Sequence, residues 1–424
     1  MDKDQKDFLL KESKTFCIFP WIHLYANPDG QAFPCCTAEQ DTIDQNIKEK
    51  TIDEVFNSDD WKNLRLDMLK NIRNPVCRRC HEVDDSHGFS YRSYANKDFG
   101  KFIDFIDETD ETGKIENPKY KFIDIRFSNH CNFTCSTCGP VFSTKWIEHI
   151  KKNNNDISNR TDLEYHKIEQ NSNYSIVKQL ENHLPTAEEI YFAGGEPLIM
   201  PEHYKLLDLI NEHQAYNVRL RYNTNLSTIQ YKGKKVTDIW QKMSEVKLGA
   251  SIDGVKDVAE LIRKGTKWSK IEQNMIELLK YENVKLNVDT VVSVLNIEHL
   301  PEMYNYIFKN NLLNERSWLS VNIAFTPLPY SITSLPKEYK DYYADKLWKF
   351  INELRKKENT PLIDPARDFL IDSLEGAIKF MHSKNTFQQE DLISLNQRSI
   401  LDKDKYKTVL PNIYKLDQDI RNGR

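Results

Sequence analysis

Three cysteines on one short loop are the residues of this sequence best suited to chemistry. Cys131, Cys135 and Cys138 follow a short apolar run with the spacing C-x3-C-x2-C. An iron–sulfur cluster normally takes four cysteines, and no cysteine follows Cys138, so a four-iron cluster held here would leave one iron open to another ligand. A zinc loop is the alternative, but structural zinc prefers C-x2-C pairs and a complete ligand set. The spacing therefore favours an iron–sulfur cluster.

Four of the other cysteines form a second candidate metal site. Cys17 and Cys35 flank an aromatic stretch with the turn signal Asn-Pro-Asp-Gly, which predicts a β-hairpin that brings the two thiols together. Cys77 and Cys80 add a C-x2-C pair. Together these four thiols predict a cage for an iron–sulfur cluster or for zinc.

Nearby residues keep alternatives open at this second site. His23 and His81 are close in sequence to the cysteines, so zinc remains the alternative to a cluster. Cys36 is spare and could be an alternate ligand, a hydrogen-atom donor or an inert buried thiol. We favour the inert thiol, because free cysteine is among the most buried residue types.

Polar motifs end three later apolar runs. Gly194-Gly195-Glu196-Pro197 follows EEIYFA, and Asn225 lies in RYNTNLS. Ser251 and Asp253 lie in GASIDG. Each motif is weak alone, but together they follow the cysteine loop in order, each at the end of a predicted strand.

This order of motifs resembles the radical S-adenosylmethionine (radical SAM) superfamily, in which SAM chelates the open iron of a 4Fe–4S cluster. The resemblance implies that Cys131, Cys135 and Cys138 bind that cluster, and that the GGEP element binds the methionine moiety with Glu196 accepting from its ammonium group. The family often has an aromatic residue before the third cysteine to contact adenine, where this chain has Thr137.

The resemblance also implies a set of cofactor-binding residues. Arg263 is similar to a carboxylate-binding arginine of relatives, with a solvated arginine at a helix end as the alternative. The complete implied set is Gly194, Gly195, Glu196, Pro197, Asn225, Ser251, Asp253 and Arg263.

The first cysteine-rich segment resembles a second module of the same enzymes. Its pattern C-x12-G-x4-C followed by C-x2-C is similar to the twitch (half-SPASM) domain, which holds one auxiliary 4Fe–4S cluster. The ligands implied are Cys17, Cys35, Cys77 and Cys80. Relatives usually carry this module after the barrel, whereas here it comes first.

Bulk composition predicts a soluble cytoplasmic protein. The 424 residues are 39% hydrophobic and 29% charged, with a net charge of −5 that gives no basic field for nucleic acid. The first residues contain no apolar signal segment, and no apolar run is long enough to span a membrane. Eight cysteines without an export signal indicate a reducing compartment and metal binding.

Periodicity divides the chain into three parts. We predict a cluster-binding domain over residues 1–112, alternating strands and helices over 113–330, and a helical region over 331–424. The first domain should include a helix with Trp61, Leu64 and Met68 on its buried face. The predicted strands are 121–127, 189–193, 218–224, 246–252, 285–292 and 320–325. Alternation of this kind predicts parallel β/α units, and six of them match the partial (β/α)6 barrel of the radical SAM family.

Polar residues recur at every second position of the predicted strands. Period two places each set on one face, so these faces predict a barrel lined for a charged or hydrogen-bonding ligand. The alternative is that some of these side chains face outward and pair with helices. The residues that we predict to contact substrate are Arg126, Arg221, Asp289 and Asn322.

These interpretations predict a radical SAM enzyme with SAM and two 4Fe–4S clusters as cofactors and a flavodoxin or ferredoxin as electron donor. The reaction implied is reductive cleavage of SAM to a 5′-deoxyadenosyl radical that abstracts a substrate hydrogen. The favoured outcome is oxidative modification or cross-linking of a peptide or protein side chain, with the auxiliary cluster taking up an electron. The alternatives are a dehydrogenase or epimerase of a small molecule such as an amino sugar, and a zinc-stabilised binding protein without catalysis.

Overall fold

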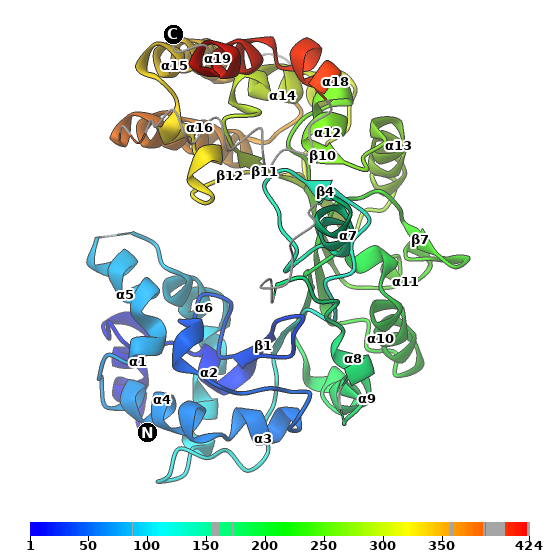
Figure 1. Ribbon diagram of the computed structural model, residues 1–424. Helices are drawn as coiled ribbons and strands as arrows, with labels where there is room; N and C mark the ends of the chain where they lie inside the picture. The colour runs from blue at the N-terminus through cyan, green and yellow to red at the C-terminus, as the bar shows by residue number, and fades with distance from the viewer. Residues whose placement is uncertain are drawn as a thin grey trace. The chain divides into compact units, whose positions relative to one another are not determined.

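The computed structural model describes residues 1–86, 88–153, 162–171, 173–356, 360–384, 386 and 403–421 (Figure 1). The chain divides into two compact units. The first comprises residues 1–130, 165–195 and 200–221, and the second comprises residues 131–164, 196–199 and 222–424. None of the helices in the described ranges is long and apolar enough to cross a membrane.

The first unit contains four strands and several helices. Its strand order is β2-β1-β3-β5, with β1 antiparallel to β2 and parallel to β3, and β3 parallel to β5. Its strands are β1 (His23–Ala26), β2 (Ala32–Phe33), β3 (Phe122–Ile125) and β5 (Glu189–Phe192). Its helices are α1 (Lys3–Lys11), α2 (Phe19–Ile22), α3 (Ile52–Phe56), α4 (Asp59–Leu69), α5 (Arg78–Asp85), α6 (Tyr91–Phe99), α8 (Ile168–Asn171), α9 (Ile176–Glu181) and α10 (Pro201–Glu212).

The second unit contains a parallel sheet in the order β9-β11-β12. Its strands are β4 (Thr134–Cys135), β7 (Gln230–Tyr231), β8 (Lys234–Lys235), β9 (Val246–Ser251), β10 (Arg263–Lys264), β11 (Val284–Val292) and β12 (Leu319–Ile323). Its helices are α7 (Thr144–Asn153), α11 (Thr237–Trp240), α12 (Lys256–Ile262), α13 (Trp268–Leu278), α14 (Leu300–Lys309), α15 (Lys337–Arg355), α16 (Asp364–Ser383), α18 (Lys403–Val409) and α19 (Pro411–Arg421). Strand β6 (Arg219–Thr224) runs from the first unit into the second.

All six predicted strands of the α/β region are present, shifted by no more than two residues at either end. The cluster-domain helix is also confirmed, because α4 buries Trp61, Leu64 and Met68. The long helices α15 and α16 of the C-terminal region, yellow and orange in Figure 1, pack on each other, and α16 packs on β12. The fold is therefore a mixed α/β fold with largely parallel strands, a small N-terminal part and a helical C-terminal region.

The predicted hairpin between Cys17 and Cys35 is only partly correct. Strands β1 and β2 flank the Asn27–Gly30 turn, in which Gly30 takes a positive φ of 93°. The first arm does not extend back to Cys17, because Phe19–Ile22 form the short helix α2 instead of a strand. Pro20 explains the difference, since proline lacks the N–H that a strand needs and its fixed φ suits a first helical turn.

The predicted alternation of side chains between two faces is confirmed in β6 and β11, where buried and half-buried residues alternate. In β6 the side chains of Arg219, Arg221 and Asn223 are half-buried while the alternate residues are buried. In β11 every second residue from Lys285 is half-buried in the same way. The polar residues of each strand therefore share one partly accessible face.

Candidate functional site

The loop of three cysteines is fixed by a short strand pairing in the second unit. Strand β4 pairs antiparallel with β10, which places Cys135 opposite Arg263. The backbone N–H of Ser136 donates to the carbonyl of Ile262 at 2.8 Å, and the Ser136 hydroxyl donates to the same oxygen at 3.0 Å. Cys131 and Cys135 are buried and Cys138 is exposed. The loop thus has a defined backbone and one thiol open to the surface.

Helix α7 and the residue before it hold the other side of the loop. The Ser143 hydroxyl donates to the carbonyl of Phe133 at 2.6 Å, and Thr144 Oγ1 donates to the carbonyl of Cys131 at 3.3 Å. The indole Nε1 of Trp146 donates to the carbonyl of Cys135 at 3.0 Å. These contacts satisfy buried carbonyl groups that would otherwise cost free energy.

A buried ion pair lies beside the three thiols. Arg263 Nη1 is 2.8 Å from Asp253 Oδ2, and Asp253 Oδ1 accepts from the backbone N–H of Val291 at 2.8 Å. Burial raises the pKa of the Cys135 thiol, and the positive charge of Arg263 opposes this shift. Asp253 therefore orients Arg263, and Arg263 favours the thiolate forms that a metal cluster requires.

Glu196 connects the GGEP segment to the cysteine loop. Its carboxylate is 1% exposed and accepts from Thr224 Oγ1 at 2.6 Å, from the Asn225 N–H at 2.7 Å and from the Leu198 N–H at 3.1 Å. The Asn225 amide donates to Asn132 Oδ1 at 2.9 Å. Three protein donors thus already hold the carboxylate that the sequence assigned to the ammonium group of SAM, so Glu196 also has a structural role.

The two glycines of the GGEP segment make room for neighbouring backbone in the first unit. Gly194 has a φ of 107°, and a Cβ added there would lie 3.1 Å from the Cβ of Arg126. A Cβ added at Gly195 would lie 2.2 Å from the carbonyl oxygen of His130. A side chain at either position would therefore displace backbone beside the cysteine loop.

The remaining predicted site residues of the second unit lie on adjacent strands. Ser251 of β9 is opposite Asp289 of β11, and both are half-buried. A Cβ added at Gly249 would lie 2.0 Å from Asp289 Oδ2, so the glycine leaves space for that carboxylate. Asn322 of β12 is exposed. Pro197, by contrast, is buried at the start of a short 3-10 turn.

The four N-terminal cysteines come together from three segments of the first unit. Burial raises the pKa of Cys17 well above its usual value, and the nearby Cys35, Cys77 and Cys80 raise it further. The pKa of Cys35 is raised to about 12, mainly by burial. Thr37 Oγ1 lies 3.3 Å from the sulfur of Cys35 and 3.8 Å from that of Cys80. The thiols are thus near enough to repel one another if ionised, as expected of a cage that binds a cation.

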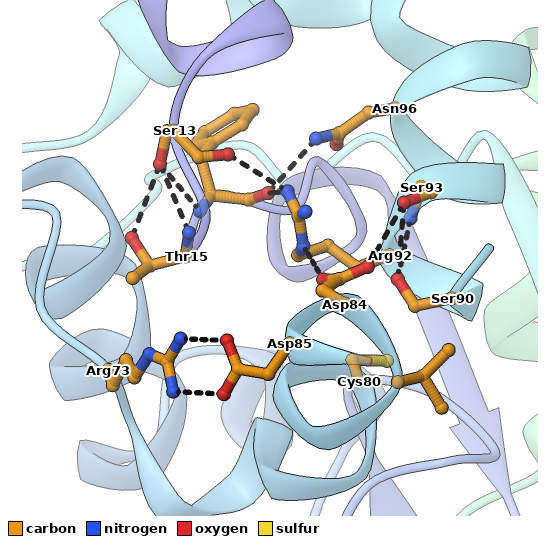
Figure 2. A network of polar contacts seen from close by, with 12 residues as sticks. Ser13, Thr15, Arg73, Cys80, Asp84, Asp85, Ser90, Arg92, Ser93 and Asn96 are labelled. Atoms are coloured by element: carbon orange, nitrogen blue, oxygen red, sulfur yellow. Dashed lines mark hydrogen bonds and ion pairs between the residues drawn. The ribbon is translucent and has the colours of Figure 1, made fainter. Parts of the chain in front are cut away.

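Arg92, whose side chain is 12% exposed, ties two of these segments together, as Figure 2 shows. Arg92 of α6 donates from Nε to Asp84 of α5 at 2.7 Å. Its Nη1 donates to the carbonyls of Ser13 and Phe16 at 3.1 Å each. Phe16 precedes Cys17, and α5 carries Cys80, so Arg92 fixes one cysteine-bearing segment to the other.

Glu39 forms a similar bridge that the sequence did not reveal. Its carboxylate binds Arg78 Nη2 at 2.9 Å and Arg79 Nε at 3.0 Å, the two arginines between Cys77 and Cys80. Glu39 lies four residues after Cys35. The only signal available in the sequence was the Arg-Arg pair inside C-x2-C, which identifies no partner.

The two histidines considered as zinc ligands lie in packed surroundings. His23 shares a hydrogen bond of 2.8 Å with the Phe122 carbonyl through Nδ1, and its ring stacks on Phe122 with centroids 4.3 Å apart. His81 is 6% exposed. The pKa of Cys36 responds to Asp124 of β3, to Arg126 just after that strand and to Tyr91 of α6, so the thiol lies near these three residues. Within the described ranges, no three His, Cys, Asp or Glu side chains are arranged to hold a single metal ion directly.

Each of the two cysteine-bearing segments matches a known family. Residues 17–81 match SPASM, described as an iron–sulfur cluster-binding domain, and residues 125–307 match the radical SAM superfamily. The chain therefore contains a SPASM domain and a radical SAM domain. Its cofactors are SAM and two iron–sulfur clusters, and the SPASM domain precedes the radical SAM domain. The chemistry of the donor sets fits, because one site offers three thiols beside a buried arginine and the other offers four thiols.

Individual relatives are distant from this chain. Over 208 residues it is 27% identical to 7,8-dihydro-6-hydroxymethylpterin dimethyltransferase of Methanocaldococcus jannaschii, covering 45% of this chain and 36% of that protein. Among solved structures, anSMEcpe with bound AdoMet is 19% identical with a TM-score of 0.39, over 56% of this chain and 61% of that chain. Streptococcus suis SuiB bound to precursor peptide SuiA is 13% identical with a TM-score of 0.37, over 65% of this chain and 54% of that chain. The chain thus spans less than two thirds of each of these relatives.

Proposed function

We propose that this radical SAM enzyme cleaves SAM reductively at the Cys131, Cys135 and Cys138 cluster and abstracts a hydrogen atom from a peptide or protein side chain. The observation that carries the proposal is the arrangement around the cysteine loop. Three thiols lie on one loop, Arg263 lies beside them, and Asn132 and Asn225 join the loop to Glu196. A 4Fe–4S cluster bound by three cysteines keeps one iron for the amino and carboxylate groups of SAM.

The roles of the surrounding residues follow from their contacts. Arg263 would bind the carboxylate of SAM, and Asp253 would hold the guanidinium in place through their 2.8 Å contact. Gly194 and Gly195 would let backbone approach the methionine moiety. Asn225 and Ser251 would complete the ribose contacts. A low-potential flavodoxin or ferredoxin would supply the electron.

The four-cysteine cage supports an oxidative outcome. Cys17, Cys35, Cys77 and Cys80 would bind an auxiliary 4Fe–4S cluster at all of its irons, which leaves no iron to bind substrate. Such a cluster is suited to accept an electron from a substrate radical. We therefore propose oxidation or cross-linking of the side chain as the net reaction.

Anaerobic reconstitution tests the proposal. We expect about eight irons per chain, corresponding to two four-iron clusters. With SAM and dithionite the protein should release 5′-deoxyadenosine, and deuterium from a labelled peptide substrate should appear in it. A colourless zinc protein would contradict the proposal. Methylated product with S-adenosylhomocysteine, or deuterium transfer from amino sugars but from no peptide, would contradict the proposed reaction.

A further inference from the structure

Two arginines of the first unit share one tyrosine ring. The guanidinium carbon of Arg221 on β6 lies 4.8 Å from the centroid of the Tyr191 ring, and that of Arg126 lies 5.8 Å from the same centroid. The Arg126 guanidinium also lies 5.1 Å from the ring of Tyr25. Cation–π contacts of this kind hold a guanidinium in place without using its N–H donors.

The ion pairs of Arg126 and Arg221 are long, so the N–H donors of both guanidinium groups are only weakly hydrogen-bonded. Arg126 reaches Asp124 only at 3.4 and 3.5 Å, and Arg221 reaches Glu189 only at 3.8 Å. Charge-assisted N–H···O hydrogen bonds are normally about 2.7 to 2.9 Å long. The side chains of Arg126 and Arg221 are nevertheless only 17% and 38% exposed, so water does not fully replace the missing acceptors.

Charge balance at the same place indicates the ligand. Arg219 contacts Glu189 at 3.2 Å, so three guanidinium groups face the two carboxylates of Asp124 and Glu189. One positive charge is therefore in excess within this contacting group. A carboxylate carries one negative charge and accepts from two guanidinium groups at once, whereas a phosphate monoester carries about −1.5 to −2.

The position of the pair suits a substrate group. Arg126 lies against Gly194 of the GGEP segment, since a Cβ on that glycine would lie 3.1 Å from the Cβ of Arg126. The electrostatic neighbours of Arg221 include Tyr91 and Tyr94, whose rings stack with centroids 5.3 Å apart. The arginine pair is thus close to the proposed SAM-binding segment and has aromatic neighbours.

We propose that Arg126 and Arg221 together bind a carboxylate of the substrate above the ring of Tyr191. The inference rests on the proposed function and adds the substrate class: a peptide with a carboxylate near the reacting residue. The carboxylate would come from an acidic side chain or from the C-terminus of the peptide. The cationic pair would orient the substrate, and neither arginine would take part in hydrogen abstraction.

Calorimetric titration of the reconstituted, SAM-loaded enzyme with small blocked amino acids tests this inference. The probes are N-acetylglutamate N-methylamide, its glutamine analogue, N-acetylphosphoserine N-methylamide, and N-acetylalanine as a mimic of a C-terminus. At least one of the two carboxylate probes should bind at least ten times more tightly than the glutamine analogue. If the glutamate probe binds more tightly, the carboxylate comes from an acidic side chain; if N-acetylalanine does, it comes from a peptide C-terminus. Equal affinity for charged and neutral probes, or tightest binding of the phosphoserine probe, would overturn the inference.

Variants assign the binding to the arginine pair. Arg126→Gln and Arg221→Gln should each lower the affinity for the carboxylate probe at least tenfold. Arg355→Gln, which changes an exposed arginine of α15, should leave that affinity unchanged. If a glutamine variant does not fold, the corresponding lysine variant keeps the charge but loses the paired donors, and should weaken binding several-fold. Unchanged affinity in the variants would overturn the inference.

This titration is separable from the proposed function, because probe binding does not require SAM cleavage. An enzyme that releases 5′-deoxyadenosine but shows no preference for carboxylates would contradict only the present inference. An enzyme that prefers carboxylates but releases no 5′-deoxyadenosine would contradict only the proposed function.

Discussion

The two cysteine sites of this protein are stabilised in different ways. The three cysteines at 131–138 lie on one loop, and backbone pairing with β10 and hydrogen bonds from residues 143–146 hold that loop. The four N-terminal cysteines come from three segments, joined by the side chains of Arg92 and Glu39. The first site thus depends mainly on local backbone structure, whereas the second depends on particular charged side chains.

Removing one cysteine from each site should give the largest difference between the two sites in SAM cleavage and product formation. Under the proposed function, Cys135→Ala should abolish 5′-deoxyadenosine formation, a loss of at least a thousandfold, because the proposed SAM-binding cluster would lose a ligand. Cys77→Ala should retain SAM cleavage but lose the oxidised product, because only electron uptake is affected. Iron analysis and product quantification check both variants. Equal loss of SAM cleavage in the two would contradict separate roles for the sites.

The dependence of the N-terminal site on charged side chains can be tested at Arg92. Arg92→Ala leaves Asp84, whose side chain is only 11% exposed, without its arginine partner, and should cost about 3 kcal/mol of folding free energy, together with the auxiliary cluster. Arg73→Ala is the matched control, since Arg73 pairs with Asp85 on the same helix but both side chains are 50% exposed. It should cost no more than about 1 kcal/mol. Urea unfolding and iron content measure both effects, and equal losses would contradict the role of Arg92.

The cysteine-loop site should respond more mildly to loss of a positioning side chain. Asp253→Asn removes the charge that orients Arg263, and we expect SAM affinity to fall about tenfold, equivalent to about 1.4 kcal/mol. Iron content should not change, because the thiols keep their backbone contacts. Asp345→Asn, an exposed carboxylate on α15, is the control. Loss of the cluster in Asp253→Asn would show that the loop also depends on side-chain charge.

Acid should destabilise the first unit through two buried histidines. Burial lowers the pKa of His23 and of His203 to about 3, whereas histidine in an unfolded chain titrates near 6.5. The folded state stays neutral while the unfolded chain gains protons, so stability is full above about pH 6.5 and is lost as pH falls toward 3. Each histidine should contribute a slope of about 1.4 kcal/mol per pH unit in this window.

Urea unfolding between pH 7 and 5 measures this slope. His23→Gln and His203→Gln should each reduce it, and the double variant should reduce it by about the sum of the two. A slope that does not change in any of the three variants would show that other groups cause the acid sensitivity.

The cysteine motifs could be recognised because they are local in sequence. C-x3-C-x2-C and the C-x2-C pair could be identified from spacing, the GGEP segment from its resemblance to a family motif, and strand alternation predicted the α/β fold. The hairpin arm before β1 was wrong because Pro20 imposes a helical turn there. The bridges from Arg92 and Glu39 could not be predicted, because they join residues up to 79 positions apart and many other charged residues could serve.

The sequence by itself determined which thiols are candidates to bind a metal cluster, because ligand type and loop spacing are set by covalent structure. Only the tertiary structure decided which charges face those ligands and each other. Arg263 beside the three thiols, and Arg126 and Arg221 on one tyrosine ring, result from segments that are distant in sequence but adjacent in space. Asp253 and Arg263 are ten residues apart and meet because helix α12 lies between them. Electrostatic interactions depend on distance and burial, and neither can be read from the order of residues along the chain.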